Sequence, residues 1–219
     1  MVSNSMSVLV IDDHALFSAG IKGLYEAMND DVVVNTFVSC DEAFGGVEDM
    51  DAVSLVLLDY HIPGTDPERN LKVLRSTFTN ASIVIVSGET DPLKVIRAIN
   101  QGASGFIPKA ATSETMISAL KIISAGGVYL PPEVNSYYST GPEAAPNSTE
   151  HPLEGLHKVT REVVELAISG MSNQAIAEKR GTSLSTIKNQ LSKAYKDLGV
   201  RNRAQLVLEC GKYNQRANR

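Results

Sequence analysis

Two short apolar runs that each stop at an aspartate constrain the fold of this chain more than any other feature. Residues 54–58 read SLVLL and are followed by Asp59, and residues 7–11 read SVLVI and are followed by Asp12 and Asp13. Apolar runs this short, without helical spacing, are typical of parallel strands covered on both faces. Because parallel strands end at the same edge of a sheet, where the connecting loops form a crevice, we expect the three carboxylates to lie together there.

Three carboxylates in one crevice repel one another unless a cation lies between them. Carboxylate oxygens are hard ligands that suit Mg2+, and this ion usually keeps several waters and accepts a phosphoryl oxygen of a substrate. The sequence therefore predicts a magnesium site formed by Asp12, Asp13 and Asp59.

Strand and helix patterns alternate along the N-terminal part of the chain, which implies right-handed crossovers and a parallel sheet with helices on both faces. We therefore expect a flavodoxin-like, doubly wound α/β domain with a five-stranded parallel sheet. In its first helix, Leu16, Ile21, Leu24 and Met28 have near-helical spacing. The strands are predicted at residues 7–11, 32–34, 54–58, 82–86 and 105–107, and the helices at 14–28, 41–47, 70–78, 91–100 and 112–124.

The character of the sequence changes at residues 131–154. This stretch holds five prolines and many serines, threonines and asparagines without an apolar period, and it predicts an extended linker. Residues 155–219 return to helical patterns. We therefore expect an α/β domain at residues 1–130 and an all-α domain at residues 155–219.

The charge differs between the two parts. Residues 1–152 carry 8 basic and 19 acidic side chains, a balance of −11, whereas residues 153–219 carry 12 and 6, a balance of +6. An acidic N-terminal part suits cation-assisted chemistry. A basic C-terminal part suits nucleic acid, because neutralising phosphates provides most of the non-specific affinity.

The sequence also predicts where the protein works. It has no stretch of about 20 apolar residues and no basic-then-apolar signal pattern at its start. Cys40 and Cys210 match no metal or redox spacing, as expected of ordinary reduced thiols. We expect a cytoplasmic protein with no membrane partner.

Residues 172–198 have the pattern of a helix-turn-helix. Residues 172–177 open a short helix, Gly181 marks the turn, and Ser183 is the predicted N-cap of a longer helix. Four apolar residues of this longer helix are expected to face inward: Ile187, Leu191, Ala194 and Leu198. The residues left on its outer face are Lys188, Asn189, Ser192, Lys193 and Lys196.

A helix of this kind can enter the major groove of double-stranded DNA. We expect Lys188 and Asn189 to reach base edges. Contacts with phosphates are expected from Lys193, Lys196, Arg201 and Arg203.

Four motifs resemble the receiver domain of two-component response regulators: LVIDDH, LLDYHIPG, IVIVSGE and GFIPK. The resemblance implies that Asp59 is the nucleophile that accepts a phosphoryl group from a partner histidine kinase. It also implies that Mg2+ is held by Asp59, Asp13, Asp12 partly through water, and the backbone carbonyl of His61.

The same resemblance implies a switch around the phosphoryl group. Lys109 and the hydroxyl of Ser87 would bind phosphoryl oxygens, and Phe106 would rotate into the space that Ser87 leaves. His14 is expected to be exposed and to have no chemical role.

The stretch GMSNQAIAEKRGTSLSTIKNQLSKAYKDLGVRNRAQLV closely resembles the four-helix DNA-binding domain of the NarL/FixJ (LuxR-type) regulators. The resemblance implies a transcription factor whose receiver controls dimerisation and releases or aligns the DNA-binding helices. The active form is implied to be a homodimer, with a dimer contact on DNA around residues 204–210.

The chain departs from the family pattern at several positions. Residues 65–70 imply a longer loop before the third helix, Pro108 precedes the lysine of the last motif, and a serine replaces the usual threonine after the fourth strand. Residues 156–160 lack the capping threonine and the glutamate of the usual Leu-Thr-Pro-Arg-Glu opening, so the next helix is expected to begin late or to be distorted. Gln190 stands where histidine is common, which affects the DNA sequence that is read.

Two alternatives stay open. The first is a receiver that a ligand or a protein partner switches without phosphorylation, with the C-terminal domain still on DNA. The second is a phosphatase of the haloacid-dehalogenase type with Asp59 as nucleophile. Such enzymes carry a second aspartate two residues further on, where this chain has His61. We therefore predict a regulator rather than an enzyme.

Overall fold

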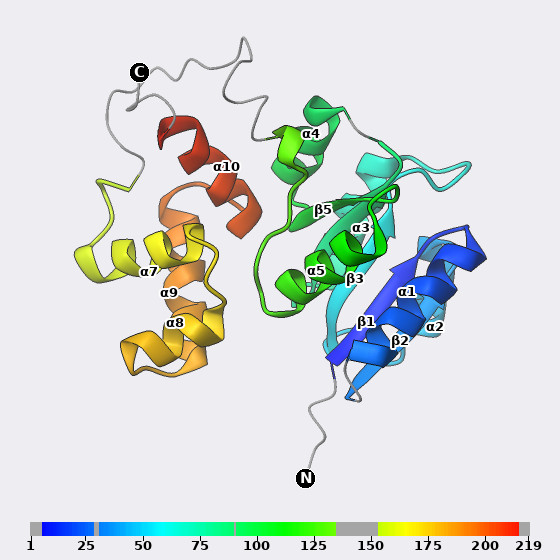
Figure 1. Cartoon of the computed structure of the whole chain (residues 1–219), viewed down its shortest axis with the longest axis horizontal. Helices are drawn as coiled ribbons and strands as arrows, with labels where there is room; N and C mark the ends of the chain where they lie inside the picture. Colours follow the sequence, from blue (N-terminus) through cyan, green and yellow to red (C-terminus); the bar gives the residue numbers. More distant parts are fainter. Residues whose placement is uncertain (1–5, 29–30, 90, 135–152, 215–219) are drawn as a thin grey trace.

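The computed structural model of the chain describes residues 6–28, 31–89, 91–134 and 153–214. Figure 1 shows an N-terminal unit built on a sheet and a C-terminal unit built of helices. None of the helices within these ranges is both long enough and apolar enough to cross a lipid bilayer.

The sheet of the N-terminal unit is fully parallel, with strand order β2-β1-β3-β4-β5. This is the order of flavodoxin-like sheets, so the predicted fold class is confirmed. The order in which successive strands are added to the sheet reverses between β1 and β3, so the loops that leave these two strands diverge there. The strands are β1 Met6–Ile11, β2 Val32–Phe37, β3 Val53–Asp59, β4 Ser82–Ser87 and β5 Gly105–Pro108.

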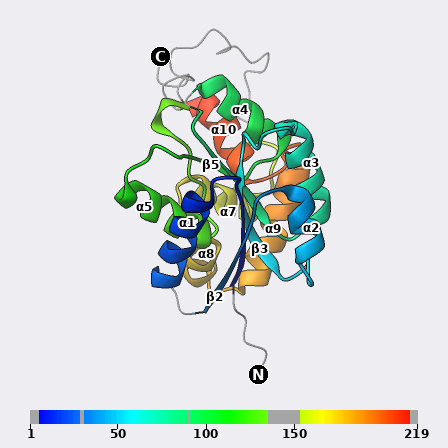
Figure 2. The same ribbon diagram turned by 90° about the vertical axis from the view of Figure 1, so that its right-hand side faces the viewer.

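Helices cover both faces of the sheet (Figure 2). Because successive side chains of a strand point to opposite faces, Val8 and Val10 of β1 pack towards α1 and α5, whereas Leu9 and Ile11 pack towards α2, α3 and α4. All four side chains are almost completely buried. The helices are α1 Ala15–Met28, α2 Cys40–Gly46, α3 Pro67–Thr77, α4 Pro92–Gln101 and α5 Ser113–Ser124.

Helix α1 uses the predicted apolar face except in its first turn, because Ile21, Leu24 and Met28 pack against the core. Leu16 is 88% exposed, so its place in the predicted stripe is wrong. The next residue, Phe17, packs against the core instead, together with Ile21 and Tyr25. The first turn of α1 is therefore rotated by one residue relative to the prediction.

Helix α3 begins three residues earlier than predicted, at Pro67 rather than at Asn70. The side chain of Asp66 accepts hydrogen bonds from the backbone nitrogens of Glu68 (2.9 Å) and Arg69 (3.4 Å), and proline suits the first helical position. Part of the segment predicted as a longer loop is therefore the first turn of α3.

The C-terminal unit contains the predicted helix-turn-helix. Gly181 ends α8 in a left-handed conformation, with φ of 62°, and the Ser183 hydroxyl accepts a hydrogen bond of 3.1 Å from the backbone nitrogen of Thr186 at the start of α9. Ile187, Leu191 and Ala194 face a hydrophobic cluster of this unit, as predicted. The helices are α7 Lys158–Ile168, α8 Asn173–Arg180, α9 Leu184–Asp197 and α10 Arg203–Asn214.

Helix α7 begins at Lys158, so the prediction of a late start is wrong. The loss of the cap is visible, because the side chain of the N-cap residue His157 makes no capping hydrogen bond. Most of the predicted linker, residues 135–152, lies outside the described residues. Leu153 is buried in the C-terminal cluster, and the limits of the two domains stay a prediction.

The two units touch through α10. Ala204 and Leu208 of this helix are buried in the same hydrophobic cluster as Ile99 of α4 and Phe106 of β5. Figures 1 and 2 both show α10 beside α4. The C-terminal unit thus covers part of the α4–β5 face of the N-terminal unit.

Candidate functional site

The predicted crevice lies at the carboxyl end of the sheet. Asp12 follows β1, Asp59 ends β3 and Lys109 follows β5. Asp12, Asp13, His14 and Asp59 each offer one ligand atom, and these four atoms all lie within 4.8 Å of one another. We call Asp12, Asp13, Asp59 and Lys109 the acidic crevice.

Lys109 ties the acidic crevice together. Its Nζ lies 2.7 Å from Asp12 Oδ2 and donates a hydrogen bond of 2.8 Å to Asp59 Oδ2. Burial alone would lower the pKa of Lys109, but the hydrogen bonds and negative charges of Asp12 and Asp59 outweigh it and raise the pKa. The lysine therefore stays charged and neutralises part of the carboxylate charge.

Asp59 is only 4% exposed, and both of its oxygens are oriented. Oδ1 accepts a hydrogen bond of 3.1 Å from the backbone nitrogen of His61, and Oδ2 accepts the bond from Lys109. The carboxylate borders an open cavity of about 410 Å³, which is also lined by His14, Phe17 and Gly88. A group the size of a phosphoryl group therefore has access to Asp59 from solvent.

His14 is exposed as predicted, with 66% of its side chain accessible, but it is not remote from the site. Its Nδ1 lies 3.1 Å from Asp12 Oδ1 and 3.0 Å from Asp13 Oδ1. The expectation that His14 is incidental is therefore wrong as far as position is concerned. In the sequence His14 directly follows Asp12 and Asp13. The turn after β1 then places its imidazole ring close to both carboxylates.

The acidic crevice fits a hard divalent cation. Asp12 Oδ2 and Asp13 Oδ1 are enclosed, with Lys109 Nζ 2.7 Å from the first and His14 Nδ1 3.0 Å from the second. Enclosed carboxylates need cationic partners, and one ammonium cannot neutralise three of them, so a divalent cation suits the remaining charge. The carboxylate donors match the preference of Mg2+.

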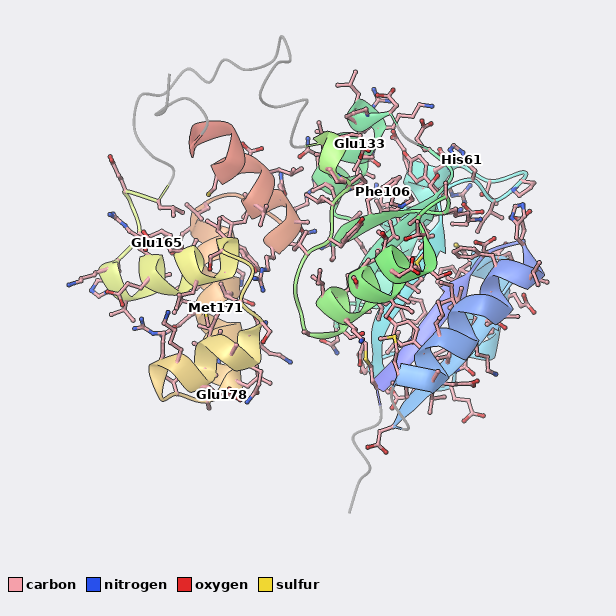
Figure 3. The ribbon with its side chains drawn as sticks, in the orientation of Figure 1. His61, Phe106, Glu133, Glu165, Met171 and Glu178 are labelled. Atoms are coloured by element: carbon pink, nitrogen blue, oxygen red, sulfur yellow. The ribbon has the colours of Figure 1, made fainter. Side chains whose placement is uncertain are left out.

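Ser87 ends β4 and Phe106 lies in β5, and both side chains are completely buried. The hydroxyl of Ser87 accepts a hydrogen bond of 3.1 Å from the backbone nitrogen of Glu89. Phe106 is completely buried, and Figure 3 shows it inside the N-terminal unit, away from His61 at the edge of the sheet. Its ring lies in the core, and its rotation with Ser87 stays a prediction.

The surface predicted to bind DNA is largely present on α9 and the turn after it. Lys188, Asn189, Ser192, Lys193, Lys196 and Arg201 are all exposed. The start of α9 faces the N-terminal unit, because Lys188 and Leu184 line a cavity of about 580 Å³ together with residues of β3, β4 and α5.

Arg203 does not lie on this surface. It is only 7% exposed, and its guanidinium donates hydrogen bonds to the backbone oxygens of Gly126 (2.9 Å), Met171 (2.7 Å) and Ala167. Burial lowers its pKa from the ordinary value. The structure therefore contradicts the prediction that Arg203 contacts phosphates, because its charge is used to join backbone segments. Arg201 and Arg203 are only two positions apart, yet the first is exposed and the second is buried. Residue type alone therefore does not predict which arginine contacts DNA.

Comparisons with known proteins agree with this architecture. Residues 8–121 match the family described as "Response regulator receiver domain", and residues 151–198 match "Sigma-70, region 4". Over 211 residues the chain is 34% identical to the glycerol metabolism activator of Pseudomonas putida, covering 93% of this chain and 94% of that protein. This chain is a response regulator of the NarL/FixJ (LuxR-type) family.

Other relatives support the same assignment. The response regulator is 26% identical to the nitrate/nitrite response regulator protein NarL of Escherichia coli strain K12, over 92% of this chain and 93% of NarL. Its fold is similar to that of RcsB from Salmonella enterica serovar Typhimurium bound to the promoter rprA in the presence of the phosphomimetic BeF3−. The TM-score is 0.53 at 22% identity, over 95% of this chain and 99% of that one. The protein is thus a transcription regulator with a receiver domain and a DNA-binding domain, not an enzyme.

Proposed function

We propose that a partner histidine kinase phosphorylates this response regulator on Asp59, and that phosphorylation controls its dimerisation and its binding to double-stranded DNA. The observation that carries the proposal is the arrangement of Lys109, whose ammonium joins Asp12 and Asp59 beside an open cavity. Transfer of a phosphoryl group to aspartate requires a carboxylate nucleophile, a positioned cation and room for the incoming group.

In the proposed transfer, an oxygen of the Asp59 carboxylate forms a bond with phosphorus. The bond between phosphorus and the histidine nitrogen of the kinase breaks, and its electron pair stays on that nitrogen. The Lys109 ammonium would exchange a carboxylate oxygen for an oxygen of the bound phosphoryl group, and the Ser87 hydroxyl would turn from Glu89 to another oxygen. The rate of phosphoryl transfer then depends on positioning and charge compensation rather than on general acid–base catalysis.

Asp12, Asp13, Asp59 and the backbone carbonyl of His61 are the groups we expect to hold Mg2+. The clustering of the carboxylate oxygens of Asp12, Asp13 and Asp59 within 4.8 Å of one another supports this assignment. When bound, the cation would offset the negative charge that accumulates on the phosphoryl oxygens. The kinase, the cytoplasmic location and the domain limits at residues 130 and 155 belong to the same proposal.

The exposed side of α9 supports DNA binding by this chain. Lys193 and Lys196 can neutralise phosphates, and Lys188 and Asn189 can reach base edges once the N-terminal unit no longer faces the start of α9. RcsB, which has a similar fold, was solved on promoter DNA. We therefore assign α9 as the recognition helix.

The contact between α10 and the receiver suggests how the two domains are coupled. Ala204 and Leu208 belong to the segment for which we expect a dimer contact on DNA, yet both are buried against the receiver. One apolar face cannot pack against the receiver and against a second copy at the same time. Dimerisation through α10 therefore requires that the receiver release this helix.

The magnitude of the switch indicates that several groups contribute. Moving an equilibrium from 1:99 to 99:1 takes about 5.5 kcal/mol of differential stabilisation. One hydrogen bond from Ser87 to a charged phosphoryl group supplies about 1.5–3 kcal/mol. Lys109 and the contacts of the dimer must provide the remainder.

Labelling of Asp59 tests this function. Wild-type protein incubated with acetyl phosphate and Mg2+ should gain one phosphoryl group, located on Asp59 by mass spectrometry, whereas Asp59→Asn should gain none. The same protein treated with a chelator should label much more slowly. If wild type takes no label while its DNA binding responds to another ligand or protein, the receiver is switched without phosphorylation.

A further inference from the structure

Phe17 is an aromatic residue in contact with the ammonium of Lys109. It lies in the first turn of α1, directly after the loop that carries Asp12 and Asp13. Lys109 Nζ lies over its ring, 5.0 Å from the centroid. An ammonium at this distance is attracted by the negative face of an aromatic ring.

The ammonium of Lys109 contacts both the Phe17 ring and the carboxylates of Asp12 and Asp59. Asp12 Oδ2 and Asp59 Oδ2 lie at 2.7 and 2.8 Å from Nζ, and the side chain of Lys109 is 19% exposed. The ring also lines both the open cavity beside Asp59 and a second cavity between α1 and α5. Lys109 lines the same two cavities, so the ring and the lysine side chain lie side by side between α1 and the site.

The two kinds of contact behave differently during phosphorylation. The carboxylate contacts must be exchanged in part, because Lys109 is to bind a phosphoryl oxygen and the carboxylates are to bind Mg2+. The ring contact need not be exchanged. The ring contact thus restricts the rotamers of the long, flexible lysine side chain in both states.

We propose that Phe17 is a positioning residue of the phosphorylation site, whose ring holds the Lys109 ammonium in place while its carboxylate partners are replaced by the phosphoryl group and Mg2+. The inference rests on the proposed phosphorylation of Asp59. The proposed role goes beyond the packing of Phe17 against the α1–α5 side of the core, because an aliphatic side chain could provide that packing without a ring.

Substitutions at position 17 separate attraction from packing. Phe17→Leu keeps an apolar side chain but removes the ring, and Phe17→Tyr keeps the ring. Replacing Phe17 by 3,4,5-trifluorophenylalanine nearly keeps the shape and weakens the negative face. Leu16→Ala is the matched control on the same turn, because Leu16 is 88% exposed.

The rate of labelling by acetyl phosphate at saturating Mg2+ is the first measurement. We expect it to fall about fivefold in Phe17→Leu, to fall by a smaller factor in the trifluorinated protein, and to stay within about twofold in Phe17→Tyr and Leu16→Ala. Equal rates for the trifluorinated protein and wild type, or a Phe17→Tyr rate as low as that of Phe17→Leu, would overturn the proposal in favour of packing.

The second measurement does not depend on phosphorylation. The 15N relaxation of the Lys109 ammonium in the metal-free protein should show less order in Phe17→Leu and in the trifluorinated protein than in wild type. Unchanged order in both would overturn the positioning role. Wild type that takes no label would instead refute the phosphorylation of Asp59, and the relaxation data would still report on Phe17.

Discussion

Lys109 shows how a single residue can serve the inactive and the active form of this receiver. In the structure its ammonium neutralises Asp12 and Asp59, and its pKa is raised by them against the effect of burial. In the proposed phosphorylated form the same charge is bound to a phosphoryl oxygen. Ser87 carries no charge, and its hydroxyl, which now accepts a bond from the backbone nitrogen of Glu89, would add one hydrogen bond to the phosphoryl group.

Ser87→Ala should therefore weaken the switch without preventing phosphorylation. The variant keeps Asp59, Lys109 and the carboxylates, so labelling by acetyl phosphate should proceed within a few-fold of the wild-type rate. The gain in DNA affinity on phosphorylation should drop by about tenfold, since a hydrogen bond to a charged group is lost. Complete loss of labelling in Ser87→Ala would contradict this division of roles, with Ser87→Thr as the control that keeps the hydroxyl.

Tyr25 makes the receiver sensitive to alkaline pH. Burial raises the pKa of Tyr25 to about 12 from its ordinary value of 10.0, in spite of a hydrogen bond with Ser124 that lowers it. Above pH 10 the unfolded chain loses this proton while the folded chain keeps it, so the free energy of unfolding falls as the pH rises from 10 towards 12. Urea unfolding at pH 8 and pH 11 should show that Tyr25→Phe loses about 1.4 kcal/mol less than wild type. The same loss in both proteins would show that Tyr25 is not the cause.

The residues of the acidic crevice could be predicted from the sequence, but their neighbours could not. Asp12, Asp59 and Lys109 each follow an apolar run, and strand ends of a parallel sheet meet at one edge. Phe17 and Arg203 carry no such signal. The spacing favoured the equally apolar Leu16 over Phe17 in the first turn of α1. The burial of Arg203 depends on three carbonyl groups from two distant segments, Gly126 and the end of α7 with the loop after it.

At the level of elements, the ends of the helices are set by short-range hydrogen bonds. Asp66, Asp91 and Thr112 each accept a bond from the first turn of α3, α4 and α5. The early start of α3 could have been read from the Asp-Pro pair at residues 66 and 67, which combines a capping residue with a proline at the first position. The strands and most helices were predictable because their apolar residues recur with a clear period. The first and last residues of the helices depend instead on single capping hydrogen bonds.

Helix α7 lacks this kind of support, and a cap should stabilise it. His157 has an extended backbone conformation, with φ of −57° and ψ of 141°, and makes no side-chain cap. We expect His157→Ser to raise the free energy of unfolding by about 1 kcal/mol, because the hydroxyl can accept from the backbone nitrogen of Thr160. Urea denaturation measures the difference. His157→Ala is the control without a cap, and equal stability of the two variants would argue against the missing cap as the weakness of α7.

For the whole molecule, the main feature is that the DNA-binding domain is held on the receiver by few polar groups. The Asn202 side chain donates to the backbone oxygens of Gly102 (2.9 Å) and Ala103 (3.0 Å) at the end of α4, and Arg203 donates to Gly126. Asn202 also caps α10 by accepting a bond of 2.9 Å from the backbone nitrogen of Gln205. One side chain thus connects the position of α10 with the end of α4.

Asn202→Asp should separate the domains while leaving α10 capped. The aspartate keeps an oxygen for the cap, loses both donors, and places a negative charge near the carbonyl end of α4, where it is unfavourable. We expect a larger radius of gyration in solution scattering and a DNA affinity that is several-fold higher without phosphorylation. Asn202→Ala, which loses the cap as well, should also be less stable. A scattering profile and a DNA affinity identical to those of wild type would show that these bonds do not hold the domains together.

The most direct test of the account measures DNA affinity by fluorescence anisotropy with and without beryllofluoride in the presence of Mg2+. For wild type we predict at least a tenfold gain in affinity for a selected DNA fragment when beryllofluoride is added, and no gain for Asp59→Asn. An affinity that does not respond in wild type, or that rises equally in Asp59→Asn, would contradict control of DNA binding through phosphorylation of Asp59.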